Sequence, residues 1–170
     1  VRKKKLERDS QLLMQDNAEH PDDPFILFNL GSIYQEQNRQ RDAIPLFRRS
    51  LELSQPTDSI VRKLYTLITQ CHNQLDEFDK GMLAVREGRS IFPDDVELLF
   101  QEGVTLRNLG DIHGAINAWE RVLTIPVGDH FASINPGIRS YLTRQNLAVA
   151  FQELKRYGDA ELHWRAVVEE

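Results

Sequence analysis

The sequence predicts an all-α protein: a solenoid of about four helix pairs, preceded by one N-terminal helix. Three observations lead to this fold class. Similar segments recur along the chain, and small and large apolar residues recur at helical spacing within each segment. No stretch alternates polar and apolar residues for long enough to indicate a sheet.

The N-terminal residues 1–23 are predicted to be a charged helix or linker, equivalent to half a repeat. Four units follow and start near residues 24, 62, 96 and 141, so their spacings are 38, 34 and 45 residues. They cover residues 24–61, 62–95, 96–140 and 141–170, and the third unit includes an insertion at residues 127–137. The alignment depends on these segments: Asn29-Leu30-Gly31, Leu67-Ile68-Thr69, Gln101-Glu102-Gly103 and Asn146-Leu147-Ala148.

Each unit has the pattern of two helices that pack against each other. The second helix carries a small, a large and a small residue at positions i, i+4 and i+7, which share one helix face. We therefore expect Trp119 and Trp164, two of the large residues, to be buried between neighbouring helices. The triplets are Ala43, Phe47 and Ser50; Gly81, Val85 and Gly88; Ala115, Trp119 and Val122; and Ala160, Trp164 and Val167.

Adjacent aspartates stand before two of the first helices, as Asp22-Asp23 and Asp94-Asp95. An aspartate in front of a helix can accept hydrogen bonds from the first free backbone N–H groups. Metal binding is the alternative, but it would need further ligands that the sequence does not offer. We interpret both pairs as helix caps.

These residues resemble the tetratricopeptide repeat family over residues 24 to 170, and the resemblance implies a right-handed superhelical solenoid. The middle spacing equals the family period of about 34 residues. The second unit departs from the family pattern, with Thr69 at a glycine-like position, His72 at an aromatic position and Gly81 at an alanine position.

A narrower resemblance is to the repeat tail of bacterial family-two glycosyltransferases. It is carried by Phe28-Asn29-Leu30-Gly31, by residues 49–54 running into 61–65, by 130–133 and by 143–149. The resemblance implies that the chain is a fragment of a longer protein whose catalytic domain precedes the repeats. Such enzymes hold their metal and nucleotide sugar with closely spaced aspartates, and no Asp-x-Asp occurs in this sequence.

Charge and composition exclude several classes of function. The net charge is −5, and because residues 1–8 contribute +4, residues 9–170 carry −9. An acidic body disfavours nucleic-acid binding. No apolar stretch is long enough for a membrane span. The single cysteine, Cys71, allows no internal disulfide, so we expect a cytoplasmic protein with no membrane or nucleic-acid partner.

The sequence also lacks a pattern that would support catalysis. The five histidines show no i, i+4 pair and no cysteine cluster, so no metal site is predicted. Cys71 and His72 are adjacent, and neighbours on a helix point about 100° apart, so we expect a buried, inert cysteine. No glycine-rich phosphate loop is present. We predict no catalytic residue and no cofactor.

The candidate function is therefore recognition of a protein or peptide by the first helices, which line the concave face of such arrays. Carboxamides recur just before the packing position, and they can bond an extended peptide backbone through both donor and acceptor. The alternative is that these are ordinary polar surface residues. A similar asparagine ladder occurs in the repeat arm of the O-linked N-acetylglucosamine transferases. The predicted groove residues are Phe28, Asn29, Thr66, Gln70, Phe100, Gln101, Gln145 and Asn146; Leu67 interrupts the ladder.

Two further features remain open. The insertion contains His130 and Phe131, which either form a functional loop or pin the loop back onto the solenoid. The last helix carries Trp164, Val167 and Val168, so a structural element that forms a homodimer of the parent protein is the alternative to a binding module.

Overall fold

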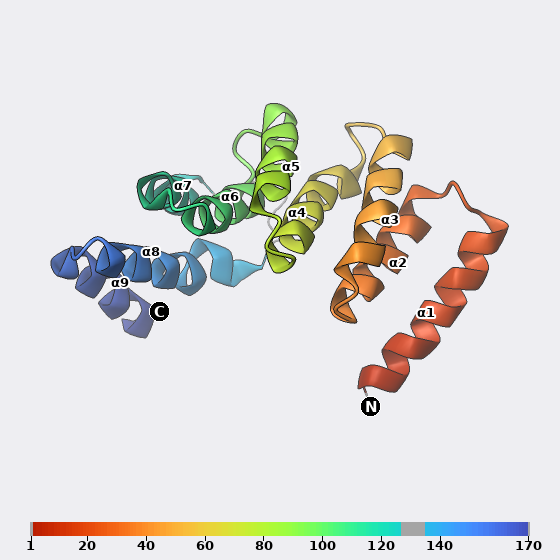
Figure 1. Cartoon of the computed structure of the whole chain (residues 1–170), viewed down its shortest axis with the longest axis horizontal. Helices are drawn as coiled ribbons and strands as arrows, with labels where there is room; N and C mark the ends of the chain where they lie inside the picture. Colours follow the sequence, from red (N-terminus) through yellow and green to blue (C-terminus); the bar gives the residue numbers. More distant parts are fainter. Residues whose placement is uncertain (1, 127–134, 170) are drawn as a thin grey trace. The chain divides into compact units, whose positions relative to one another are not determined.

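A computed structural model describes residues 2–126 and 135–169 (Figure 1). Over these ranges the chain is helical and contains no strand, so the all-α prediction is confirmed. The chain divides into two compact units, residues 1–91 and residues 92–170.

Unit 1 consists of α1 and two helix hairpins, and each hairpin is formed by a first and a second helix of one repeat. Helix α1 packs on α2, and α3 packs on α4, so the hairpins are stacked within the unit. Helix α4 also contacts α2, which places the first helices of the two repeats side by side. The helices are α1 (Arg2–Glu19), α2 (Pro24–Glu36), α3 (Gln40–Leu53), α4 (Ser59–Gln74) and α5 (Phe78–Ile91).

Unit 2 holds the third and fourth hairpins and the described end of the insertion. Helix α6 pairs with α7 and α8 pairs with α9, while α7 packs on α8. The short 3₁₀ helix η2 precedes α8 and contacts α6, α7 and α8. The elements are α6 (Val96–Asn108), α7 (Ile112–Thr124), η2 (Pro136–Arg139), α8 (Tyr141–Glu153) and α9 (Tyr157–Glu169).

The turn between the two helices of each repeat has one residue in the left-handed region, with φ between 57° and 88°. In the first repeat, Asn38 is followed by Arg39, whose N–H donates to the carbonyl of Tyr34 at 2.8 Å. Such a residue ends a helix by satisfying carbonyls of its last turn. The four residues are Asn38, Asp76, Gly110 and Lys155, and their spacings of 38, 34 and 45 match the repeat spacings.

The core of unit 1 forms where the aromatic ring of α3 lies against the glycine of α2. Phe47 is fully buried, and a Cβ atom at Gly31 would lie 2.6 Å from its ring. Glycine is therefore required for this close approach of ring and backbone. Leu30, Leu64 and Ile68 belong to the same cluster and are also buried.

The third repeat, in unit 2, has the same contact between a glycine of the first helix and a ring of the second, and here the ring is the larger indole. Trp119 is fully buried against Gly103, and its indole N–H donates to the carbonyl of Phe100 at 3.1 Å. Trp164, at the equivalent position of the fourth repeat, is only half-buried. The prediction of two buried tryptophans is therefore correct for Trp119 and wrong for Trp164. Within unit 2, α7 packs on both α6 and α8, whereas the α9 that carries Trp164 packs on α8.

Candidate functional site

The predicted groove residues of unit 1 lie on α2 and α4, but their side chains differ in exposure. Asn29 is exposed, whereas Phe28 is half-buried, with its ring centroid 6.5 Å from that of Phe47. Gln70 is half-buried and accepts a hydrogen bond from the Gln35 amide at 3.3 Å. This amide pair joins the first helices of two successive repeats.

The expectation that Thr66 lines an open groove is wrong. Its side chain is only 1% exposed, and its hydroxyl donates to the Arg62 carbonyl at 3.5 Å. Helix α4 contacts α2, α3 and α5, so most of its circumference is covered and few positions remain open to a ligand.

In unit 2, α8 carries two half-buried amides, Gln145 and Asn146. The Asn146 amide donates to the Leu142 carbonyl at 2.8 Å, one turn earlier in the same helix, so part of its bonding capacity is used locally. Phe100, on α6, is half-buried and packs against both hydrophobic clusters of unit 2.

Gln101 also departs from the prediction of an outward-facing amide, because it is only 8% exposed. Helix α6 is packed by α7 and by η2, the described end of the insertion. A residue of η2, Ile138, joins the cluster with Val96 and Leu99 of α6. The segment where the insertion ends and η2 begins therefore adds packing to α6.

Two residues of the first-helix surface in unit 1 were not predicted. Phe25, at the start of α2, is 49% exposed and lies one turn before Asn29. Gln35 supplies the donor to Gln70. The i, i+4 spacing from Phe25 to Asn29 was the sequence signal that could have identified the aromatic residue.

The insertion candidates, His130 and Phe131, lie outside the described residues. Its described end is held by Arg139, whose guanidinium donates to the carbonyls of Ile125 and Pro126. Asn135 accepts a hydrogen bond from the Gly137 N–H at 3.0 Å. These contacts fix the segment that leads into α8.

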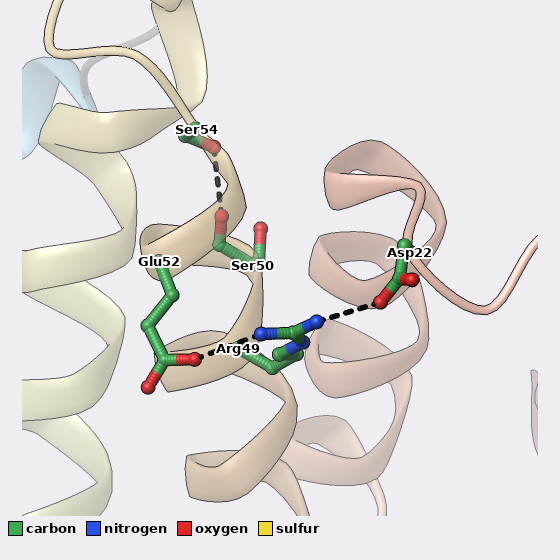
Figure 2. Close-up of polar contacts among 5 residues, drawn as sticks. All are labelled: Asp22, Arg49, Ser50, Glu52 and Ser54. Carbon is green, nitrogen blue, oxygen red and sulfur yellow. Dashed lines mark hydrogen bonds and ion pairs between the residues drawn. The ribbon is translucent and has the colours of Figure 1, made fainter.

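Of the adjacent aspartates before α2, Asp23 caps the helix and Asp22 forms an ion pair. Asp23 accepts from the N–H groups of Phe25 and Ile26 at 2.8 and 3.1 Å, while Asp22 bonds Arg49 of α3 at 2.8 Å (Figure 2). Ser50 donates to the Pro24 carbonyl at 2.7 Å. Both aspartates thus serve the fold.

The second aspartate pair repeats this arrangement in unit 2. Asp95 caps α6 by accepting from the Leu98 N–H at 2.9 Å, and Asp94 pairs with Arg121. Arg49 and Arg121 each stand 27 positions after their aspartate. In both the first and the third repeat, therefore, an ion pair joins the second helix to the turn that precedes the first helix.

Cys71 and His72 make no common site. Cys71 is buried, and burial raises the pKa of its thiol to about 12, which suppresses thiolate formation. The His72 Nδ1 atom lies 2.9 Å from the Glu77 carboxylate. His163 stacks on Phe151 with centroids 5.6 Å apart, and burial followed by the charge of Arg144 lowers its pKa.

Across residues 2–126 and 135–169, no three His, Cys, Asp or Glu side chains come together in a way that could hold a metal ion. In the same part of the chain, no helix combines the length and the apolar character needed to cross a membrane.

Comparisons with known proteins support the repeat type. Residues 26–57 match the sequence model of the tetratricopeptide repeat. No curated protein matches the chain significantly.

Several solved structures share the fold over nearly the whole chain. A crystal structure of MamA is 17% identical, with a TM-score of 0.76 over 98% of this chain and 89% of that one. MamA from Desulfovibrio magneticus RS-1 is 15% identical, with a TM-score of 0.77 over 99% of this chain and 86% of that one.

Another similar structure is the APC/C hetero-tetramer Cut9–Hcn1. It is 19% identical and has a TM-score of 0.77 over 97% of this chain, which spans 30% of that longer chain. At these identities the comparison concerns the fold. The chain therefore has the fold of a tetratricopeptide-type helical solenoid, and its first repeat carries the sequence pattern of that family.

Proposed function

We propose that this chain is a non-catalytic scaffold that binds protein or peptide partners through the outward surfaces of its first helices. The observation that carries the proposal is the exposed surface of α2 in unit 1, together with its junction with α4. There an exposed aromatic residue, Phe25, and an exposed amide, Asn29, occupy successive turns of α2. The Gln35–Gln70 amide pair joins α2 to α4.

This surface has the chemistry needed to hold an extended peptide. The Asn29 amide can donate to a peptide carbonyl and accept from a peptide N–H without reading the side chain. Phe25 offers an apolar contact for a peptide side chain, and an aromatic residue supplies such contact at low entropic cost. Specificity would then come from the side chains that pack on Phe25.

In unit 2 the corresponding surface is provided by α8. Gln145 and Asn146 are half-buried there, and Arg107 of α6 bonds Glu153 of α8 at 3.0 Å. Arg107 occupies the position in its repeat that Gln35 occupies in the first. We propose that each unit offers one such surface.

A paired substitution tests the proposal. Peptide partners are first selected on an array with the wild-type chain. The Phe25→Ser and Asn29→Ala double variant should then lose most of this binding, because it removes the aromatic contact and the amide hydrogen bonds together. Each amide hydrogen bond contributes about 0.5–1.5 kcal/mol. Leu83→Ser is the matched control, because Leu83 is 55% exposed on the second helix α5.

Retained binding by the double variant, at an unchanged melting temperature, would move the partner site away from α2. Equal loss in the Leu83→Ser control would show that array binding reflects general surface hydrophobicity.

We also propose that the scaffold accompanies a family-two glycosyltransferase domain in its parent protein. Support comes from the resemblance of residues 28–31, 49–54 and 143–149 to the repeat tails of such enzymes. The coding sequence that surrounds this segment tests the proposal directly. A neighbouring domain without a nucleotide-sugar fold would contradict it.

A homodimeric structural element is the second candidate function. The observation in its favour is the apolar surface of α9, where Leu162 is 66% and Val168 is 87% exposed. Light scattering distinguishes the two candidates. A dimer that Leu162→Glu converts to a monomer would favour the structural element, whereas a monomeric wild type would favour the binding scaffold.

A further inference from the structure

A second candidate binding surface lies in unit 1, on elements other than the α2–α4 surface proposed above. A groove of about 480 Å³ is lined by α1, α2 and the first half of α3. Its apolar lining includes the buried Leu30 and Tyr34 of α2, Leu46 of α3, and Met14 of α1. Met14 is 45% exposed, and a flexible thioether adapts well to different ligands.

The groove lies between α1 and α3. One repeat further on, an ion pair of 2.5 Å between Arg48 and Glu87 joins α3 to α5. Among the side chains that the structure describes, residues 7–19 of α1 form no hydrogen bond or ion pair with α3. Within this lining, Met14 and Leu46 are the apolar residues named above that solvent or a ligand can reach.

One backbone carbonyl of α3, among the residues that line the groove, lacks its usual helical donor. Pro45 lies four residues after Arg41 in α3, and because proline has no N–H, the Arg41 carbonyl loses its usual helical donor. An extended peptide backbone carries N–H groups that can donate to such a carbonyl.

The charge at the rim selects among such peptides. Arg39 pairs with Asp42 at 2.8 Å, so these two charges largely cancel. Arg41 is 75% exposed and lies 3.7 Å from Glu77, longer than the usual 2.7–2.9 Å of a charge-assisted hydrogen bond. Arg41 can therefore accept a second carboxylate, and the rim favours an acidic ligand over a basic one.

We infer that this groove binds an extended segment of a partner protein in which a large apolar side chain stands next to an acidic residue. The apolar side chain occupies the space between Met14 and Leu46. The acidic residue pairs with the Arg41 guanidinium. The inference does not depend on binding at the α2–α4 surface.

The two methionines of the chain provide a direct test. Met14 lines the groove, whereas Met82 is 7% exposed on α5 and does not. The probe is a blocked Gly/Ser peptide with one Phe preceded by Glu, titrated into the protein labelled with ¹³C at the methionine methyl groups. The Met14 signal should shift saturably while the Met82 signal stays in place.

Two control peptides and three variants sharpen the result. Replacing Phe by Ser in the peptide should abolish the shift, and replacing Glu by Lys should weaken it. Arg41→Glu should reverse the preference between the Glu and Lys peptides, with changes of about two- to five-fold in affinity, as for one exposed ion pair. Leu12→Glu, at a 53% exposed position on the same helix, and Phe25→Ser, on the α2–α4 surface, should leave the titration unchanged.

The inference is overturned if Met14 does not shift, if both methionine signals shift together, or if the Glu and Lys peptides bind equally. A Met14 shift that depends on protein concentration without peptide would assign the groove to a second copy of the chain, and this too would overturn it.

Discussion

The first and second repeats, which lie side by side in unit 1, fill the same interface with different residues. In the first, Gly31 lies against Phe47; in the second, Thr69 and Val85 hold the equivalent positions. Phe47, Thr69 and Val85 are all at most 1% exposed. The two helices of a repeat therefore require a certain combined volume at this point, and the division between them can change.

A second difference concerns the residue that covers the end of the first helix. In the first repeat the Arg39 guanidinium lies 4.1 Å from the ring centroid of Tyr34. In the second, His72 and Glu77 hold these positions and are joined at 2.9 Å. The fourth repeat returns to the first arrangement, with Arg156 at 4.6 Å from the ring of Phe151. The residue after the turn therefore changes together with the side chain that it contacts: arginine lies over an aromatic ring, and glutamate bonds histidine.

The largest effect is expected in the third repeat, where the small-against-large arrangement of the first repeat contains a tryptophan. Trp119→Ala should cost about 3–5 kcal/mol of unfolding free energy, because it empties a fully buried site. Trp164→Ala should cost less, because Trp164 is half-buried. Urea denaturation followed by circular dichroism measures both values. Equal costs would contradict the difference in packing between α7 and α9.

A smaller effect is expected when only the threonine of the second repeat's Thr69–Val85 pair is placed at the equivalent position of the first repeat. Gly31→Thr adds side-chain atoms where a Cβ already comes within 2.6 Å of Phe47, and overpacking of this kind costs about 1–3 kcal/mol. Adding Phe47→Val recreates the Thr–Val pair and should recover part of the loss. Urea denaturation measures the recovery.

Cys71 offers an independent measure of opening in the neighbouring repeat. Its thiol is buried with a pKa raised to about 12, so labelling by a thiol reagent requires opening of the structure. Gly31→Thr should accelerate labelling and the double variant should slow it again. If the double variant is no more stable than Gly31→Thr, the idea of a shared volume fails.

The Tyr34–Arg39 pair of the first repeat can likewise be introduced at positions 72 and 77 of the second repeat. His72→Tyr alone should lower the melting temperature, because it removes the imidazole that Glu77 bonds and adds volume at a 7% exposed site. Glu77→Arg alone should also lower it. The double variant recreates the Tyr–Arg pair of the first repeat and should exceed both single variants. Strict additivity of the two losses would show that the residues do not act as a pair.

The smallest effect is a pH dependence in the second repeat. The hydrogen bond from His72, followed by that from Lys80, holds the Glu77 pKa below its ordinary value of 4.5. A carboxyl with a lowered pKa in the folded state contributes stability that is complete above its unfolded pKa and is lost as pH falls through the folded value. The melting temperatures of wild type and Glu77→Gln should therefore converge as pH decreases from 5 to 3. A constant difference across this range would exclude Glu77 as the titrating group.

Much of the fold could be predicted from the sequence, because helix pairing is a local property. The positions of Gly31 and Gly103 opposite large aromatic residues follow from spacing within one hairpin. The caps at Asp23 and Asp95 depend on the next three residues only. The partners of Asp22 and Asp94 lie 27 residues away and could not be read from such local rules.

The candidate surfaces were predicted less completely, because exposure depends on every neighbouring element. Repeat position placed Asn29 on an open helix face, but it also placed Thr66 and Gln101 there, and both are buried. Phe25 was missed because it precedes the aligned segment Asn29-Leu30-Gly31 within the first unit. The groove beside Met14 and Asn17 involves three helices whose contacts no periodicity describes.

The sequence by itself thus determined the all-helical class, the four hairpins and the small-against-large contacts, because these depend on spacings within about 30 residues of chain. Only the tertiary structure decided which first-helix residues remain open to a ligand. Helix α4 is enclosed by α2, α3 and α5, and η2 packs on α6. Burial is a sum over contacts from distant parts of the chain, so two residues at equivalent repeat positions can differ in exposure although their local sequence patterns agree.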